Sequence, residues 1–376
     1  MEASRSLRLV YPGTAVLVSG AARHLDWLEE FMGPDFAAGP PGPAGHSVRL
    51  EIDSGRYLDL RRAGPDPAGT HLDCFALESI TVRLPLWRSG SDALTLLDAE
   101  YRVFYVVSPD RSEIRLIAPR FGLAVRNSLM RVVRELAMIG TERAGGLVLH
   151  GAAVLLGGHG LVFAGPKKAG KTSLLLHLLS HPRAQYVAND RVVVTAVDDG
   201  AMLRGLPTIV TVRERTARLF PELERRLASS GFHAWSTLAE SARRPRSGRH
   251  GRHAAWTLSP PQLAAIMGVG RVPEGPLRAL VFPRVVGGPG GLELTRLGSA
   301  EVLDRLSGVL FRSRWPARQA EMLAGPDAAP ATGARERACR QLAAAVPGFE
   351  CALGRDAFRT VTSAFDRLAG VGADGG

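Results

Sequence analysis

Residues 147–194 read LVLHGAAVLLGGHGLVFAGPKKAGKTSLLLHLLSHPRAQYVANDRVVV, and this stretch decides the fold. It contains the octapeptide GPKKAGKT at residues 165–172, which fits the pattern G-x-x-x-x-G-K-S/T. The apolar run at 161–164 is typical of a buried strand, and the run at 173–179 predicts a helix. Strand, glycine-rich turn and helix is the order in which this pattern binds phosphate. We therefore interpret the octapeptide as a nucleotide-binding loop in an α/β protein.

Each residue type in this loop has a physical role in holding a triphosphate. Glycines let the backbone wrap closely, so that its N–H groups point at phosphate oxygens, and the following helix adds a partial positive charge. We expect Lys171 to reach the β- and γ-phosphates, and the Thr172 hydroxyl to ligate Mg²⁺. The predicted nucleotide contacts are Gly165, Pro166, Lys167, Lys168, Ala169, Gly170, Lys171, Thr172 and Ser173.

The lysines of the chain are confined to this loop. Lys167, Lys168 and Lys171 are the only three, and the other 44 of the 47 basic residues are arginines. So strong an arginine bias is typical of a GC-rich genome. A compact ammonium fills a role that the planar fork of arginine fills poorly. The alternative is a chance match at a surface turn, but the flanking elements and the placement of the lysines favour a nucleotide loop.

Composition limits the class of protein. A chain of 376 residues predicts two or three domains, and 45% hydrophobic with 22% charged residues indicates an ordinary soluble globular protein. The three cysteines are scattered without metal spacing, which argues against a disulfide framework or a zinc site and favours a cytoplasmic location. We find no apolar run of membrane-spanning length and no signal-peptide core, so no membrane partner is expected.

The net charge of +11 is partly concentrated in one segment. Residues 241–253 read SARRPRSGRHGRH and contain five arginines, two histidines and no acidic residue. A solvated loop explains this composition, and the alternatives are a flap over the nucleotide or a dock for an acidic partner. No aromatic residue lies between the arginines to stack on bases, so we do not expect a nucleic-acid partner.

Residues 1–145 are expected to form a separate N-terminal α/β domain. The apolar patterns predict strands at 14–19, 47–52, 75–84, 94–107 and 113–117, and helices at 23–32 and 126–139. His71, Asp73 and Cys74 have no further ligand at useful spacing, so we interpret them as part of a loop rather than as a metal site.

Residues 146–376 are expected to form the nucleotide-binding domain. Two apolar runs joined by Gly157 and Gly158 indicate a hairpin that leads into the octapeptide. Further strands are predicted at 186–194, 280–283, 292–297 and 348–353, and helices at 212–227, 299–322 with a break at Pro316, 335–345 and 356–368. Residues 326–333 resemble a linker, and 370–376 are predicted to be a disordered tail.

A His-Gly-Ala opening at 150–152, a hairpin, the octapeptide, and then Val187-Ala188-Asn189-Asp190 resemble the catalytic domain of HPr kinase/phosphorylase and its relatives. The resemblance is strongest over 147–194, weakens over 203–285 and does not extend to 1–140. It implies an α/β P-loop kinase core of the HPr kinase/phosphoenolpyruvate carboxykinase type. It also implies ATP and Mg²⁺ as cofactors and a homo-oligomer.

The resemblance assigns roles to single residues. Lys171 corresponds to the phosphate lysine, Thr172 to the Mg²⁺-binding hydroxyl, His150 to the active-site histidine and Asp190 to the second, Mg²⁺-handling Asp of an Asp-Asp pair. The first Asp, the proton acceptor of the family, is Asn189 here, and an amide cannot take a proton at neutral pH. Either another group is the base, with His150 as the natural substitute, or the substrate needs little help, or catalysis is lost.

Other correspondences are looser. Glu214 falls near a second metal-binding Glu of the family, and Arg249 and Arg252 are two candidates for its catalytic arginine. The loop departs from the family at 166–168, where small residues are usual and this chain has Pro-Lys-Lys. His150 also has a structural alternative, as a strand-end histidine bonded to backbone.

Two functional hypotheses follow. The first is a kinase that transfers the γ-phosphate of ATP to a hydroxyl, on a serine of a protein or peptide or on a small hydroxylated metabolite, in a setting such as peptide or natural-product tailoring. The N-terminal domain would then recognise the acceptor. The second is an ATP-binding sensor or scaffold with little or no catalysis, which Asn189 motivates. A general ATPase motor is not favoured, since no further arginine-finger motif is apparent.

Overall fold

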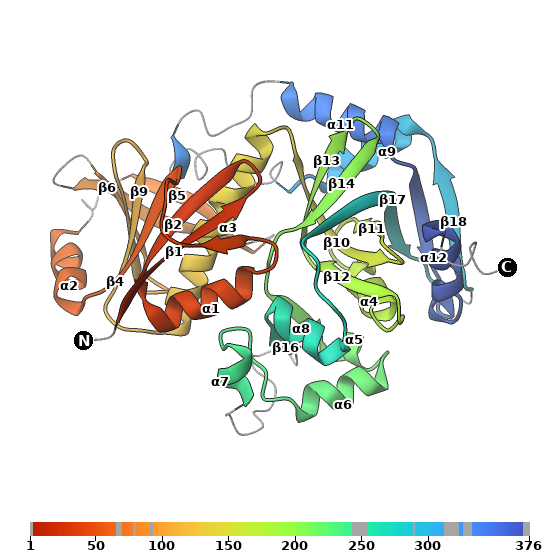
Figure 1. Ribbon diagram of the computed structural model, residues 1–376, viewed down its shortest axis with the longest axis horizontal. Helices are drawn as coiled ribbons and strands as arrows, with labels where there is room; N and C mark the ends of the chain where they lie inside the picture. Colours follow the sequence, from red (N-terminus) through yellow and green to blue (C-terminus); the bar gives the residue numbers. More distant parts are fainter. Residues whose placement is uncertain are drawn as a thin grey trace. The chain divides into compact units, whose positions relative to one another are not determined.

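The computed structural model describes residues 3–64, 70–77, 80–89, 93–242, 255–288, 290–311, 323–325 and 333–370. These form a mixed α/β protein with several sheets and helices (Figure 1). Contacts divide the described residues into two units, one of 3–144 with 323–325 and one of 145–311 with 333–370. None of the described helices is long and apolar enough to cross a membrane.

The first unit is built on a nine-stranded sheet in which β2–β4 and β4–β9 are parallel and the other pairs antiparallel. Its order is β3 (Ala37–Gly39), β1 (Ser4–Tyr11), β2 (Thr14–Ala21), β4 (His46–Ile52), β9 (Glu113–Ala118), β8 (Val103–Val107), β7 (Ala93–Asp98), β6 (Ile80–Ser89) and β5 (His71–Leu77). Helices α1 (Ala22–Met32), α2 (Ser54–Ala63) and α3 (Leu123–Arg143) pack on it. Tyr57 of α2, for example, contacts Phe104 at 5.1 Å between ring centroids.

Several predictions for this unit are corrected. The strands predicted at 75–84 and 94–107 are each two antiparallel strands, β5 with β6 and β7 with β8. The second break has a local cause, because the Asp98 carboxylate accepts a hydrogen bond from the Tyr101 N–H (2.9 Å) and Arg102 adopts a φ of 55°. His71 and its neighbours lie in β5 rather than in a loop. The predictions missed β1, β3 and α2.

The second unit contains a ring of five paired strands. Strand β10 (Leu147–Leu156) pairs with β11 (His159–Ala164) and β13 (Arg191–Val197), and β13 pairs with β14 (Gly200–Gly205). Strand β17 (Glu274–Val285) pairs with both β14 and β11 and so closes the ring. Parallel to β17 lies β19 (Gly348–Leu353), followed by the edge strand β18 (Leu292–Leu297), while β12 (Ala184–Ala188) pairs with β10.

Successive side chains along these strands point alternately into two separate hydrophobic cores. Leu161 and Phe163 of β11 face the core that holds α4 (Lys171–Leu178) and α12 (Val361–Ala369), where Phe163 meets Phe365 edge-on at 5.4 Å. Val162 and Ala164 face the core that holds α9 (Ser299–Val309) and α11 (Ala334–Ala345). Burial on both faces explains why β10 and β11 appear in the sequence as continuous apolar runs.

A smaller subassembly packs into the α4 core. Strands β15 (Val210–Arg213) and β16 (Ala255–Leu258) pair, and α5 (Glu214–Ala217), α6 (Pro221–Ser229), α7 (Leu238–Ala242) and α8 (Pro260–Met267) surround them. The single helix predicted at 212–227 is therefore corrected to the end of a strand followed by two short helices, α5 and α6. Burial alternates through VTVR at 210–213, a β-branched run that favours a strand, and Pro221 begins a separate helix at its first turn.

Two more elements differ from the prediction. The strand predicted at 186–194 is broken at Asn189 and Asp190 into β12 and β13, and the helix predicted at 356–368 is a 3-10 turn, η3 (Ala357–Arg359), followed by α12. Helix α9 ends at Val309, and Pro316 lies outside the described residues. So do Arg249 and Arg252 with 243–254 of the basic segment, 326–332 of the linker and the tail from 371.

Candidate functional site

The octapeptide forms a tight loop, which we call the glycine loop (residues 165–172), between β11 and the N-terminus of α4. The Lys171 ammonium donates to the Gly165 carbonyl at 2.7 Å and to the Pro166 carbonyl at 2.9 Å. The Lys171 side chain turns back into the loop, and the residue is only 8% exposed. The loop therefore encloses a fixed positive charge at a helix N-terminus, where an anion is stabilised.

The backbone of the glycine loop requires its second glycine. Gly170 has a φ of 103° and precedes the first turn of α4, where the Leu174 N–H donates to its carbonyl at 3.0 Å. A Cβ atom at Gly170 would lie 2.6 Å from Cδ1 of Leu353. Both the left-handed conformation and this contact exclude a larger residue. The side chains of Pro166, Lys167 and Lys168 are exposed.

Backbone pairing brings His150 and Asp190 to the glycine loop. The Gly165 N–H donates to the His150 carbonyl at 3.4 Å, and the Gly151 N–H donates to the Asp190 carbonyl at 3.1 Å. Their side chains meet, with His150 Nε2 3.4 Å from Asp190 Oδ1. The histidine side chain is 13% exposed and the carboxylate 42%. The glycine loop and Asp190 therefore flank β10 at His150, the loop on the edge that pairs with β11 and Asp190 on the edge that pairs with β12 and β13.

Arg191 is a neighbour that the sequence did not single out. It lies directly opposite His150 in the β10–β13 pair, so both side chains leave the same face of the sheet. The residue is 6% exposed, and its guanidinium carbon lies 4.0 Å from the centroid of the Phe311 ring. The available signal is an arginine directly before three valines at the start of a buried strand, because a buried charge there must be paired or stacked.

Asn189 has a structural role in the bend between β12 and β13. The Tyr186 hydroxyl donates to Asn189 Oδ1 at 2.6 Å, and Asn189 Nδ2 donates to the Ile209 carbonyl at 3.4 Å. Tyr186 is 1% exposed, so the first of these bonds anchors the amide to the core. The amide accepts one hydrogen bond and donates another, whereas a carboxylate can only accept.

Replacing Asn189 by aspartate is therefore not expected to restore a base. The new carboxylate oxygen would face the Ile209 carbonyl without a proton to donate, which costs about 1–3 kcal/mol of the free energy of unfolding. Urea unfolding of Asn189→Asp measures this loss, with Gln341→Glu on the exposed side of α11 as the amide-to-acid control. Full stability together with faster ATP turnover in Asn189→Asp would contradict this role.

The remaining candidate site residues lie at the starts of two helices. Thr172 and Ser173 lie partly exposed in the first turn of α4. Glu214 begins α5 and forms an ion pair with Arg218 at 2.5 Å.

Among the described residues no group of three His, Cys, Asp or Glu side chains could hold a metal ion. The oxygens of Thr172 and Asp190 suit Mg²⁺, which keeps several waters and takes few protein ligands beside phosphate, so this donor set fits Mg²⁺ only together with a nucleotide.

The two cysteines whose side chains are described are not nucleophiles. Cys339 and Cys351 are both buried and unpaired with each other. Burial raises the pKa of the Cys351 thiol to about 12, and burial also raises the pKa of Cys339. Both thiols therefore stay protonated near neutral pH, where only a thiolate attacks.

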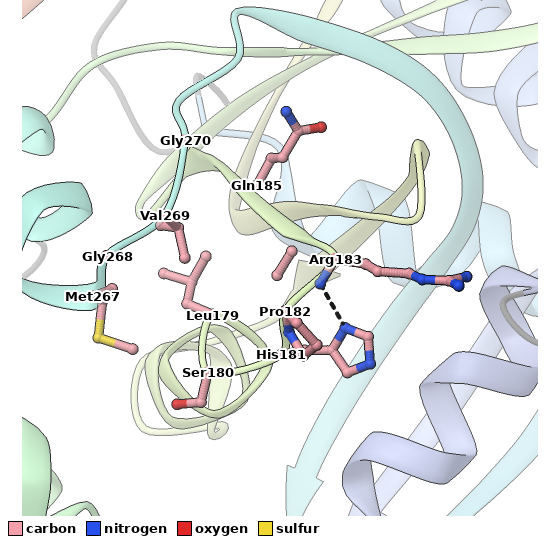
Figure 2. Close-up of a pocket in the computed structure, with 11 residues that line it drawn as sticks. Leu179, Ser180, His181, Pro182, Arg183, Gln185, Met267, Gly268, Val269 and Gly270 are labelled. Carbon is pink, nitrogen blue, oxygen red and sulfur yellow. Dashed lines mark hydrogen bonds between the residues drawn. The ribbon is translucent and has the colours of Figure 1, made fainter.

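A pocket of about 430 Å³ lies at the other end of α4 (Figure 2). It is lined by residues 179–185 and by residues 267–270 at the end of α8, and the glycine loop is not part of its wall. One internal bond is visible there, from the Arg183 N–H to Nδ1 of His181 at 3.1 Å. The pocket is therefore distinct from the predicted nucleotide site.

No protein-family model and no curated protein sequence matches this chain.

Proposed function

We propose that this chain is an ATP- and Mg²⁺-dependent kinase that transfers the γ-phosphate to a hydroxyl group, with the P-loop kinase core implied by the family resemblance. The observation that carries the proposal is the Lys171 ammonium held by two carbonyls inside the glycine loop, with the His150–Asp190 pair fastened to the same loop. A buried cation at a helix N-terminus complements a triphosphate, and a histidine beside it complements a hydroxyl that loses its proton.

Each residue has a defined task in the transfer. Lys171 neutralises charge on the β- and γ-phosphate oxygens, and Thr172 and Asp190 would hold Mg²⁺, which would supply further charge neutralisation. The acceptor oxygen bonds to the γ-phosphorus as the bond to the β–γ bridging oxygen breaks, so ADP leaves. The hydroxyl proton passes to Nδ1 of His150, because Nε2 faces the Asp190 carboxylate, and that carboxylate stabilises the imidazolium that forms.

The acceptor belongs to the same proposal. It is a serine of a protein or peptide or a small hydroxylated metabolite, as in peptide or natural-product tailoring, and the N-terminal unit selects it. The proposal also includes a cytoplasmic location and a homo-oligomeric assembly. No part of it involves nucleic acid.

Asn189 supports a second candidate, an ATP-binding sensor or scaffold. Its amide is engaged with Tyr186 and Ile209, at the position where the resembling kinases carry their base. A chain without that base would bind ATP and Mg²⁺ and change conformation or partner affinity without turnover.

Incubation with γ-labelled ATP and Mg²⁺ separates these functions. The kinase forms ADP and labels an acceptor, which is supplied as a panel of serine-containing peptides and hydroxylated small molecules. ATP binding without ADP under every condition favours the sensor. Absence of ATP binding by calorimetry would reject both.

A further inference from the structure

We propose that three rings, His177, Phe220 and Phe358, form a platform on which the aromatic base of the nucleotide stacks. We call these residues the ring cluster. The inference rests on the proposed nucleotide site and deepens it, because it makes a nucleoside triphosphate, and not a bare polyphosphate, the preferred ligand of the glycine loop.

The ring cluster lies along the open face of α4. His177 follows Lys171 by six residues, which is about 9 Å along a helix axis. Ser173 and His177 are four residues apart, so they share a face, and both are partly exposed while Leu174 and Leu178 are buried. A nucleotide whose phosphates lie in the glycine loop can therefore extend its ribose and base along this face.

The three rings contact one another and remain partly exposed. Ring centroids are 5.4 Å apart for His177 and Phe358, 6.2 Å for His177 and Phe220, and 5.9 Å for the two phenylalanines. His177 Nε2 lies 3.1 Å from the Thr362 hydroxyl, which fixes the imidazole. Burial lowers the pKa of His177, so its ring is neutral at neutral pH. Rigid, partly open aromatic faces are the surfaces on which bases stack.

The sheet topology brings Phe358 to the phosphate side. Strands β11, β17 and β19 run parallel, so their carboxyl ends lie at one edge, where ligands of α/β sheets bind. The glycine loop follows β11, and η3 with Phe358 follows β19. The glycine loop and the last residue of β19 are in contact, because Cδ1 of Leu353 lies 2.6 Å from where a Cβ of Gly170 would be.

The ring cluster also anchors α4 against α12 and the start of α6, so its test must separate stacking from packing. We compare the affinity of the full chain for ATP with that for inorganic tripolyphosphate, which has the same phosphates and no base. Phe358→Leu keeps an apolar side chain in place but removes the aromatic face. Leu219→Ala is the matched control, because Leu219 is 54% exposed beside Phe220 and outside the ring cluster.

We expect Phe358→Leu to weaken ATP binding roughly 5- to 100-fold by calorimetry, because a base–aromatic stack contributes that much. Tripolyphosphate binding should stay within about twofold of wild type, which also shows that the variant is folded. His177→Ala should give the same selective loss, and Leu219→Ala should change neither ligand.

Three results overturn the platform. ATP affinity equal to that of tripolyphosphate in the wild type, or unchanged ATP affinity in Phe358→Leu, shows that no base stacks there. Equal losses for both ligands show a packing role only. These results leave the glycine loop as a phosphate site, whereas failure of the wild type to bind either ligand rejects the proposed nucleotide site itself.

Discussion

Replacing Lys171 by alanine is expected to weaken ATP binding by on the order of 100-fold and to reduce phosphate transfer below detection. The substitution removes the buried ammonium and leaves the Gly165 and Pro166 carbonyls facing the space that the phosphates enter. Carbonyl oxygens repel phosphate oxygens, so the loss exceeds that of a single hydrogen bond. Calorimetric titration with ATP in Mg²⁺ measures the binding loss, and label transfer measures the chemistry.

Lys171→Arg is not expected to rescue binding. The guanidinium is planar and wider than an ammonium, and Lys171 is 8% exposed inside a loop whose carbonyls lie within 3 Å of its nitrogen. Arg296→Ala on the exposed edge strand β18 is the control for the loss of one positive charge, and it should bind ATP normally. Wild-type labelling by Lys171→Ala would remove the glycine loop from the mechanism.

Local patterns predicted the elements around the glycine loop. The runs 147–156 and 161–164 are apolar on both faces and are interrupted by Gly157 and Gly158, so the β10–β11 hairpin and the helix after the loop follow from the sequence. The same patterns failed where tertiary partners decide. Nothing near Asn189 indicates that its amide bonds to a carbonyl twenty residues later, and the valines on either side suggested one unbroken strand.

The contacts between side chains at the site were less accessible to prediction. The family resemblance selected His150 and Asp190, but their 3.4 Å separation depends on the register of β10 with β13, which no local pattern encodes. The ring cluster unites residues from three distant segments, and single aromatics in a sequence indicate only a core. Arg191 is similar, because its partner ring belongs to Phe311, far along the chain.

Replacing Asp190 by asparagine is expected to reduce the rate of phosphate transfer roughly 10²- to 10⁴-fold, because in the proposed mechanism one carboxylate serves both Mg²⁺ and His150. The amide is nearly the same size, so the fold should survive, and the bond from Gly151 to the backbone carbonyl of residue 190 is kept. The two tasks can be separated by titrating ATP with and without Mg²⁺. Asp190→Asn should lose the Mg²⁺-dependent gain in affinity, while its affinity for free ATP should remain.

His150→Gln completes the comparison. The glutamine retains a polar side chain but cannot accept a proton at neutral pH, so transfer should fall by a similar factor while the Mg²⁺-dependent gain in ATP affinity remains. If both variants lose that gain equally, His150 acts on the metal site rather than on the acceptor hydroxyl. If Asp190→Asn transfers phosphate at the wild-type rate, the carboxylate has no part in the reaction, and its contact with His150 only holds the bend between β12 and β13 against β10.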